Sequence, residues 1–284
     1  MTWDFHEPRD LTGALQLLAT HGEDAHLIAG GTATVLLMRQ GLLRPGHVVS
    51  LRRIGALAGI ARTTDGGLRI GAMATHRDAE RSPHVRAFSP ALANAFASVA
   101  TIRIRNQATV GGNLAHADPA QDPPPMLAAL GASVTAVSPR GERTIAVEDL
   151  AVDHFTTSLA ADEIITEVTV PALASRTRAT YLKFLPRTAD DYATVSVAAV
   201  LRLQEGVVTT ARVVLGAVGP TPIRARKVEA ALMGERPTSE RVARAAAVVR
   251  DEVDPLDDYR GSSSYKREMA AVWTARALLA LIEA

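Results

Sequence analysis

The chain has 284 residues, 47% of them hydrophobic, which is enough to bury a substantial core and suggests about two domains. Its formal net charge is only +1, and it has neither a basic tail nor basic residues interleaved with aromatics, so the composition disfavours a nucleic-acid partner. No apolar run approaches the roughly 20 residues of a membrane span, and the absence of cysteine excludes disulfides, a cysteine nucleophile, thiolate zinc sites and cysteine-ligated iron–sulfur clusters on this chain.

The first half of the chain predicts short strands alternating with helices. Residues 11–21 carry apolar side chains at helical spacing, and residues 26–29 form a short apolar run typical of a buried strand. A helix is expected over 35–40, where Thr32 or Thr34 could provide the N-cap. Further on, we expect strands at 48–51, 68–71 and 164–170, helices at 90–100 and 123–130, and a hairpin of 133–137 with 143–147.

The second half predicts a sheet followed by helices. After a candidate linker at 172–178, strand-like runs are expected at 181–185, 193–203 and 207–218, the last two joined by a hairpin signal at Gln204-Glu205-Gly206. Helices are expected over 223–233, 239–253 and 264–284. This order fits an antiparallel sheet covered by helices on one face, so the whole chain predicts an α+β fold.

Two diglycine segments carry most of the functional signal, and the first follows the strand at 26–29. It comprises Ala29, Gly30, Gly31 and Thr32. Because glycine has no Cβ, consecutive backbone N–H groups can approach a phosphate closely, and a following helix N-terminus favours an anion further. A lone diglycine is a weak signal, since such pairs occur in many surface turns. Neither the G-x-G-x-x-G fingerprint nor the G-x-x-x-x-G-K-[ST] phosphate loop is present.

The second diglycine ends a longer polar stretch that begins at Thr101. Arg103, Arg105 and Asn106 precede it, and we expect residues 109–113 (TVGGN) to form a loop. Two glycine loops far apart in the sequence could clamp a diphosphate from both sides. The pair therefore points to a nucleotide cofactor.

Polar residues beyond the second diglycine are candidates for ligand contacts. Asp122 is a candidate to accept hydrogen bonds from a ribose or adenine and a candidate N-cap of the helix that starts at Pro123, and the two roles do not exclude one another. Lys183 and Tyr192 border a polar segment that is either a plain turn or a contact to a flat ligand. His116, Asp118 and Asp122 include one imidazole only, so we assign no residue of this chain to a metal.

Taken together, these motifs resemble the FAD-binding medium subunits of the molybdenum hydroxylases, the group that includes the carbon monoxide dehydrogenase medium subunit and the flavin part of xanthine dehydrogenase. The matching segments are residues 29–34, 101–106, 109–114, 116–122, 183–187, 190–193 and 261–267. The resemblance implies a two-part FAD-binding domain of the vanillyl-alcohol-oxidase (PCMH) type at 1–172, with subdomains at about 1–55 and 56–172. It also implies a C-terminal flavoprotein domain of the carbon monoxide dehydrogenase type at 177–284.

The resemblance also assigns the cofactor contacts. Both diglycine segments would hold the FAD diphosphate, Asp122 would contact the adenosine end, and Lys183 and Tyr192 would approach the isoalloxazine. No catalytic residue is implied on this chain. The residues implied to contact FAD are Ala29, Gly30, Gly31, Thr32, Ala33, Thr34, Thr101, Ile102, Asn106, Thr109, Val110, Gly111, Gly112, Asn113, Asp122, Lys183 and Tyr192.

By this resemblance the chain is an oxidoreductase subunit that relays electrons. Substrate would be hydroxylated at a molybdopterin centre on a large subunit, and electrons would pass through [2Fe-2S] clusters on a small subunit to FAD and on to an external acceptor. The lack of cysteine fits that division of labour. The resemblance also implies a heterotrimer. We expect a cytoplasmic location, because no secretory signal is visible. Carbon monoxide dehydrogenase subunits typically carry Gly-Gly-His-Ser where this chain has Gly-Gly-Thr-Ala, which favours an aldehyde, purine or N-heterocycle as substrate.

Two other functions are consistent with the motifs. One is a stand-alone flavin reductase of the same fold, resembling UDP-N-acetylenolpyruvoylglucosamine reductase. It would need its own proton donor, and the sequence shows no clear one, with only Ser196 and Glu205 left open. The other is a non-catalytic nucleotide-binding or assembly protein that has lost its flavin. The two diglycine segments argue against that second alternative.

Overall fold

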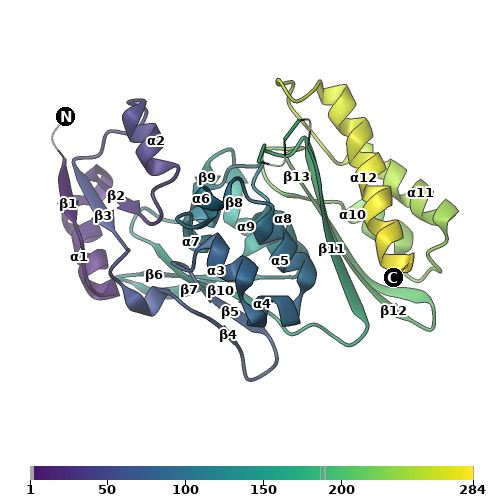
Figure 1. Cartoon of the computed structure of the whole chain (residues 1–284), viewed down its shortest axis with the longest axis horizontal. Helices are drawn as coiled ribbons and strands as arrows, with labels where there is room; N and C mark the ends of the chain where they lie inside the picture. The colour runs from purple at the N-terminus through teal and green to yellow at the C-terminus, as the bar shows by residue number, and fades with distance from the viewer. Residues whose placement is uncertain (1–2, 186, 189, 284) are drawn as a thin grey trace.

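The computed structural model describes residues 3–185, 187–188 and 190–283. A small parallel sheet lies at one end of the long axis (Figure 1), with β1 (Asp4–His6), β3 (His47–Ser50) and β2 (Ala25–Ile28) in the order β1-β3-β2. The helix α1 (Leu11–His21) packs on this sheet through Ala14 and Leu18. The 3-10 helix η1 (Gly22–Asp24) connects α1 to β2, and α2 (Thr34–Arg39) follows β2.

A second, antiparallel sheet forms the middle of the molecule. Its five strands lie in the order β4 (Ile60–Arg62), β5 (Leu68–Gly71), β10 (Ile164–Val170), β6 (Ser133–Ser138) and β7 (Gly141–Ala146). The helices of this part are α3 (His76–Arg81), α4 (Pro83–Phe88), α5 (Pro90–Ala97), α6 (Ile102–Arg105), α7 (Val110–His116), α8 (Pro123–Ala129), α9 (Val147–Leu150) and the 3-10 helix η2 (Gly55–Leu57). A two-stranded ribbon of β8 (Ala151–Asp153) and β9 (Thr156–Thr157) completes it. Phe96, Leu127 and Val168 are fully buried where these helices meet the sheet.

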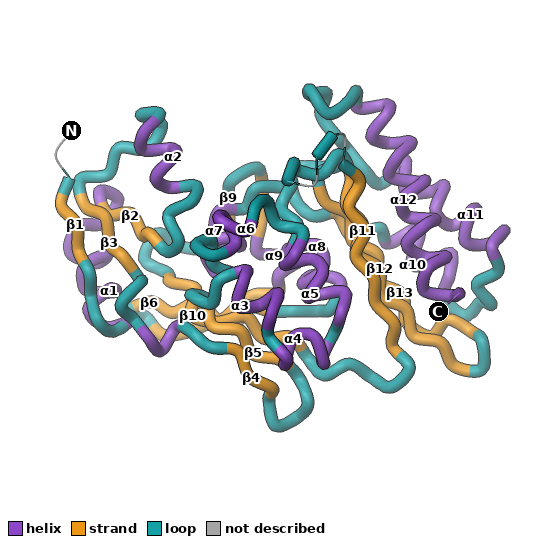
Figure 2. Tube along the Cα trace, viewed as in Figure 1, coloured by secondary structure: helices purple, strands orange, loops and turns teal. Residues whose placement is uncertain are grey.

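The C-terminal part is a four-stranded antiparallel sheet of β11 (Thr177–Phe184), β12 (Val195–Gln204), β13 (Val207–Gly216) and β14 (Ile223–Arg224). One face is covered by α10 (Arg226–Leu232), α11 (Ser239–Ala247), the 3-10 helix η3 (Val248–Asp251) and α12 (Ser263–Glu283), as Figure 2 shows. Alternation along β12 places Val197 and Leu201 in that core, whereas Ala198 and Val200 join the core that includes α5 and α8. The second face of the sheet therefore packs against the preceding part of the chain.

The α+β class and the C-terminal sheet with helices on one face are confirmed. The strand β1 and the helices α3, α4 and α6 were not predicted, because elements of three to six residues are too short to show a period. The expectation that Thr32 or Thr34 caps α2 is wrong, since Ala33 occupies the N-cap position and no side chain supplies the cap. The domain boundaries at 172 and 177 stay predictions.

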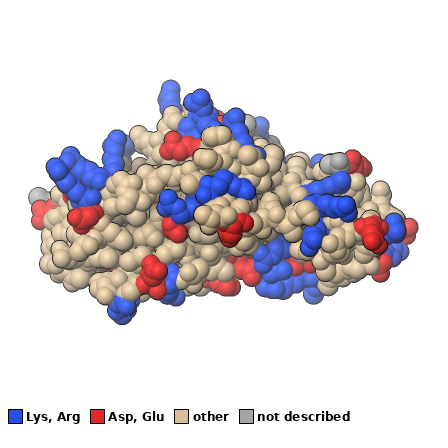
Figure 3. Space-filling view, turned by 90° about the horizontal axis from the view of Figure 1, so that it is seen from below, with Lys and Arg blue, Asp and Glu red and all other residues tan. Residues whose placement is uncertain are grey.

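The surface shows mixed charge. On the face seen in Figure 3, Lys and Arg side chains are interspersed with Asp and Glu, in line with the net charge of +1. Within the described residues, no helix combines the length and the apolar composition that crossing a membrane requires.

Candidate functional site

The first glycine segment, defined here as residues 29–34, is a tight turn between β2 and α2. Gly31 has φ +73°, a conformation that favours glycine, and its carbonyl oxygen accepts a hydrogen bond from Val35 N at 3.0 Å. In the described part of the chain, the N–H groups of residues 30–34 donate to no carbonyl or side chain. This half-buried turn thus presents several backbone donors without protein partners, which is what a phosphate group requires.

The second glycine segment, residues 109–113, is not a loop. It is the N-cap and first turn of α7: Thr109 Oγ1 accepts from Gly112 N at 3.2 Å. Val110 N donates to the carbonyl of Ala74 at 2.9 Å, and Gly111 N donates to that of Ala72 at 2.8 Å. The loop expected from the sequence is therefore corrected. These N–H groups are already bonded within the protein, so the segment offers a ligand fewer backbone donors than the first one does.

The two glycine segments lie against one another. A Cβ added to Gly30 would lie 1.9 Å from the carbonyl oxygen of Gln107, just before the second segment, and a Cβ added to Gly112 would lie 3.4 Å from Ala29 Cβ. Beside them, Asn113 Oδ1 is buried without a hydrogen-bond partner in the described residues. An orphaned acceptor of this kind marks a place for an external donor. The close approach was expected from the sequence, but that the pair holds a diphosphate stays a prediction.

A buried ion pair joins α8 to β11. Lys183 Nζ lies 2.9 Å from Asp122 Oδ2 and donates to the carbonyl oxygen of Ser98, also at 2.9 Å. The hydroxyl of Tyr181 donates to Asp122 Oδ1 at 2.5 Å. Asp122 does occupy the N-cap position of α8, but its side chain makes no capping hydrogen bond, so the plain-cap interpretation of this residue is wrong.

Burial dominates the electrostatics of this pair. It raises the pKa of Asp122 to about 6, although Lys183 and the Tyr181 hydroxyl both favour the carboxylate. Burial also raises the pKa of Tyr181 well above its usual value, and the Asp122 charge acts in the same direction. At neutral pH the site therefore holds a carboxylate that takes up a proton more readily than an ordinary aspartate.

Tyr192 lies near the same carboxylates. Burial, followed by the neighbouring charge and hydrogen bond of Asp118, raises the pKa of its hydroxyl to about 12, and Asp122 contributes at longer range. The guanidinium of Arg260 sits 5.7 Å from the centre of its ring. The residue remains 48% exposed, with Arg260 over its ring.

Three further residues implied by the resemblance lie on or beside the short helix α6. Thr101 caps α6 by accepting from Ile104 N at 3.4 Å, Ile102 is 48% exposed on that helix, and Asn106 is its C-cap. Sequence reasoning missed Tyr181 and Ser98 as partners of the ion pair. The two-residue spacing of Tyr181 and Lys183 puts both side chains on one face of β11, and this spacing was the available sequence signal for Tyr181. No sequence signal marks Ser98, because it contributes only its backbone carbonyl.

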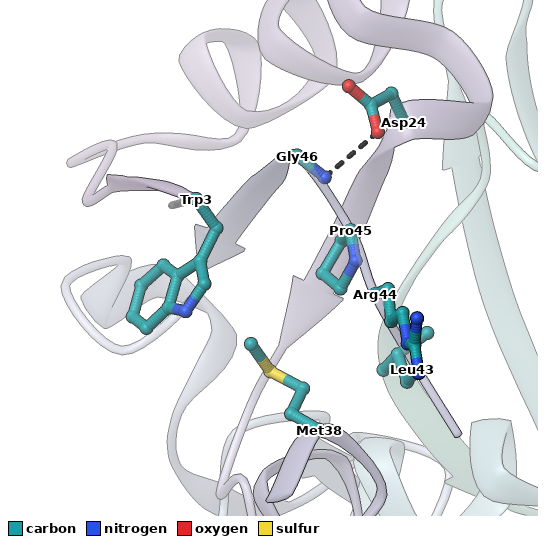
Figure 4. A pocket seen from close by; sticks show the side chains of 7 residues that line it. All are labelled: Trp3, Asp24, Met38, Leu43, Arg44, Pro45 and Gly46. Carbon is teal, nitrogen blue, oxygen red and sulfur yellow. Dashed lines mark hydrogen bonds between the residues drawn. The ribbon is translucent and has the colours of Figure 1, made fainter. Parts of the chain in front are cut away.

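A separate hollow of about 450 Å³ lies in the N-terminal part. Figure 4 shows the side chains that line it, with Gly46 N donating to the Asp24 carboxylate; they are Trp3, Asp24, Met38, Leu43, Arg44, Pro45 and Gly46. None of the residues implied to contact FAD lines this hollow.

Family comparisons cover almost the whole chain. Residues 1–173 match the family described as the FAD binding domain in molybdopterin dehydrogenase, and residues 180–281 match the CO dehydrogenase flavoprotein C-terminal domain. The carbon monoxide dehydrogenase medium chain of Hydrogenophaga pseudoflava is 34% identical over 276 residues, covering 97% of this chain and 96% of the relative. Subunit alpha of the 6-hydroxypseudooxynicotine dehydrogenase complex of Paenarthrobacter nicotinovorans is 36% identical over 278 residues, covering 98% and 93%.

A solved structure shares the architecture. In carbon monoxide dehydrogenase from Hydrogenophaga pseudoflava lacking the Mo-pyranopterin moiety of the molybdenum cofactor, one chain matches with a TM-score of 0.95 at 36% identity, covering 99% of this chain and 97% of the other. The same order of sheets and helices therefore extends over nearly the full length of both chains.

Proposed function

We infer the role of this chain from its family: it belongs to the FAD-binding medium subunits of the molybdenum hydroxylases and is an oxidoreductase subunit with an FAD-binding domain. We propose that it holds one FAD and passes electrons from iron–sulfur clusters on a small partner subunit to that FAD, and from there to an external acceptor. The observation that carries this proposal is the run of N–H groups at residues 30–34 without partners in the described chain, packed against the start of α7.

The residues present fit FAD. The backbone donors of the first glycine segment would bind the diphosphate, and Asn113 Oδ1, buried and unpartnered among the described residues, would accept a hydrogen bond from the cofactor. The cofactor supplies the redox chemistry when bound, and the protein sets its position and electrostatic surroundings.

Asp122 and Lys183 belong to one end of the cofactor. Since their charged atoms are 2.9 Å apart, they would not contact the adenosine and isoalloxazine ends separately, as the resemblance suggested. We assign both to the isoalloxazine end, because Tyr192, a partly exposed residue, lies within electrostatic reach of Asp122. There the pair would hold the polar edge of the flavin through an ammonium donor and a carboxylate acceptor.

The partners follow from the relatives and from the missing cysteines. A chain with no cysteine cannot ligate a cysteine-bound cluster itself, so we propose an iron–sulfur small subunit and a molybdenum large subunit as partners. The two relatives named above differ in the substrate in their names, carbon monoxide and 6-hydroxypseudooxynicotine. Substrate choice would accordingly reside on the large subunit, and Gly-Gly-Thr-Ala in the first glycine segment favours an aldehyde, purine or N-heterocycle over carbon monoxide.

A flavin-reduction experiment separates this role from that of a stand-alone flavin reductase. The chain is purified alone and, by affinity capture from its host, together with the proposed small and large subunits. Each preparation is mixed anaerobically with aldehydes, purines and N-heterocycles while flavin absorbance is followed. We expect bleaching in the complex and none with the isolated chain. Reduction by the isolated chain at the rate of the complex would contradict the relay.

A further inference from the structure

Three histidines from distant parts of the sequence meet beside the parallel sheet. They are His6 on β1, His21 at the end of α1 and His47 at the start of β3. One ring nitrogen from each lies within 4.8 Å of the others. His6 Nε2 and His47 Nδ1 are 3.1 Å apart, and the rings of His21 and His47 stack with centroids 3.6 Å apart.

The fold explains why these side chains converge. In the parallel pair β1–β3, Asp4 is in register with His47 and His6 with Val49, so all four point to the same face of the sheet. The helix α1 packs on that face, with Leu18 in the same cluster as Val49. Its C-terminal residue, His21, is thereby carried beside the two strand histidines.

We propose that His6, His21 and His47 bind a divalent transition-metal ion, with Zn²⁺ as the physiological candidate. Imidazole nitrogen is a preferred ligand of zinc, copper and nickel. Two nitrogens on one tetrahedral zinc, each about 2.0–2.1 Å from the metal, are about 3.3 Å apart, so the nitrogens are already near that spacing, and the His21 ring would turn out of its stack on His47 to complete the set. Asp4 Oδ2, 3.8 Å from His47 Nδ1, is placed to act as a fourth ligand.

The position of this cluster indicates a structural role. His47 begins β3, and Ala25, its register partner on β2, begins that strand. The first glycine segment follows the opposite end of β2. The ion would therefore tie β1, α1 and β3 together near the start of β3, whereas the first glycine segment follows the end of β2, and it would stabilise the folded chain by binding it in preference to the unfolded one.

The test uses the full-length chain without a histidine tag, stripped with EDTA and desalted. Zn²⁺ is titrated by calorimetry, and Co²⁺ serves as a spectroscopic probe of tetrahedral nitrogen ligands. We expect one Zn²⁺ per chain, a higher thermal midpoint with Zn²⁺, and visible Co²⁺ bands of tetrahedral type. His47→Gln and His21→Gln should each weaken Zn²⁺ binding by at least about tenfold while leaving FAD content unchanged.

His84→Gln provides the matched control, because His84 is exposed on α4 and lies outside the cluster. It should bind Zn²⁺ as the wild type does. The proposal is overturned if the wild type shows no stoichiometric Zn²⁺ binding, or if folded His21→Gln and His47→Gln proteins bind it as tightly as the wild type. Circular dichroism and FAD content identify a variant that has failed to fold, in which case the other cluster variant decides.

Discussion

Removing Lys183 should cost less stability than removing its partner Asp122. In Lys183→Met, the carboxyl of Asp122 can take up a proton. Its pKa is already about 6, so at pH 7 the protonated form lies only about 1.4 kcal/mol above the ionised one. The carbonyl of Ser98 also loses its donor, at about 1–3 kcal/mol. The sum is a loss of about 3 kcal/mol.

Asp122→Asn leaves a buried ammonium group instead. That group would be left without the carboxylate that pairs with it and would keep only the Ser98 carbonyl as a partner. Breaking a buried pair in this way costs about 3–5 kcal/mol, and we expect the upper half of that range. The double variant Lys183→Met/Asp122→Asn, with no buried charge, should be more stable than Asp122→Asn alone.

Urea unfolding at pH 7, followed by tryptophan fluorescence, measures all three variants against the wild type. A lost acceptor or donor at the flavin should also lower FAD retention in each of them. A larger loss for Lys183→Met than for Asp122→Asn would refute the reasoning. So would losses below about 1 kcal/mol for both single variants, the value typical of exposed pairs.

Three further predictions concern single positions. Gly30→Ala should lose FAD and about 1–3 kcal/mol of stability, because its Cβ would lie 1.9 Å from the Gln107 carbonyl oxygen. Gly55→Ala is the control, since a Cβ there meets nothing within 4 Å. Equal FAD content in the two variants would contradict the packing argument. Burial lowers the pKa of His76 to about 4. The free energy of unfolding measured with urea should therefore fall by about 3 kcal/mol from pH 6.5 to pH 4, because the unfolded chain binds a proton that the folded chain does not. His76→Met should remove most of this fall, and an unchanged fall in the variant would show that other groups cause it. The hydroxyl of Tyr192, with a pKa of about 12, should stay protonated at pH 10.5; Tyr192→Phe removes one late-titrating tyrosine from the ultraviolet titration, and loss of an early one instead would count against the assigned surroundings.

Much of the fold follows from periodicity. The long strands β12 and β13 and the helix α12 were predicted with small errors at their ends, because each is long enough to show its period. The helix expected over 239–253 starts correctly but ends at Ala247, where the 3-10 helix η3 follows. The family resemblance drawn from the motifs is confirmed by the comparisons. The short helices around Thr101 and Thr109 escaped prediction, since tertiary contacts such as Val110 N to the Ala74 carbonyl stabilise them rather than local sequence.

The site was predictable in its residue types and not in its contacts. Sequence reasoning selected Asp122 and Lys183 separately and assigned them to opposite ends of FAD, because nothing in a linear pattern shows that α8 and β11 meet. The histidine cluster was missed for the same reason: His6, His21 and His47 have no metal-ligand spacing, and only the parallel register of β1 with β3 brings them together.

The central claim is that this chain holds FAD at the first glycine segment. The most direct measurement is the amount of FAD released by acid from the full-length chain after reconstitution and gel filtration, for the wild type and for Gly30→Ala. We predict one FAD per wild-type chain and a yellow protein, with little FAD in the variant. A folded, colourless wild-type chain that retains no FAD would contradict the account.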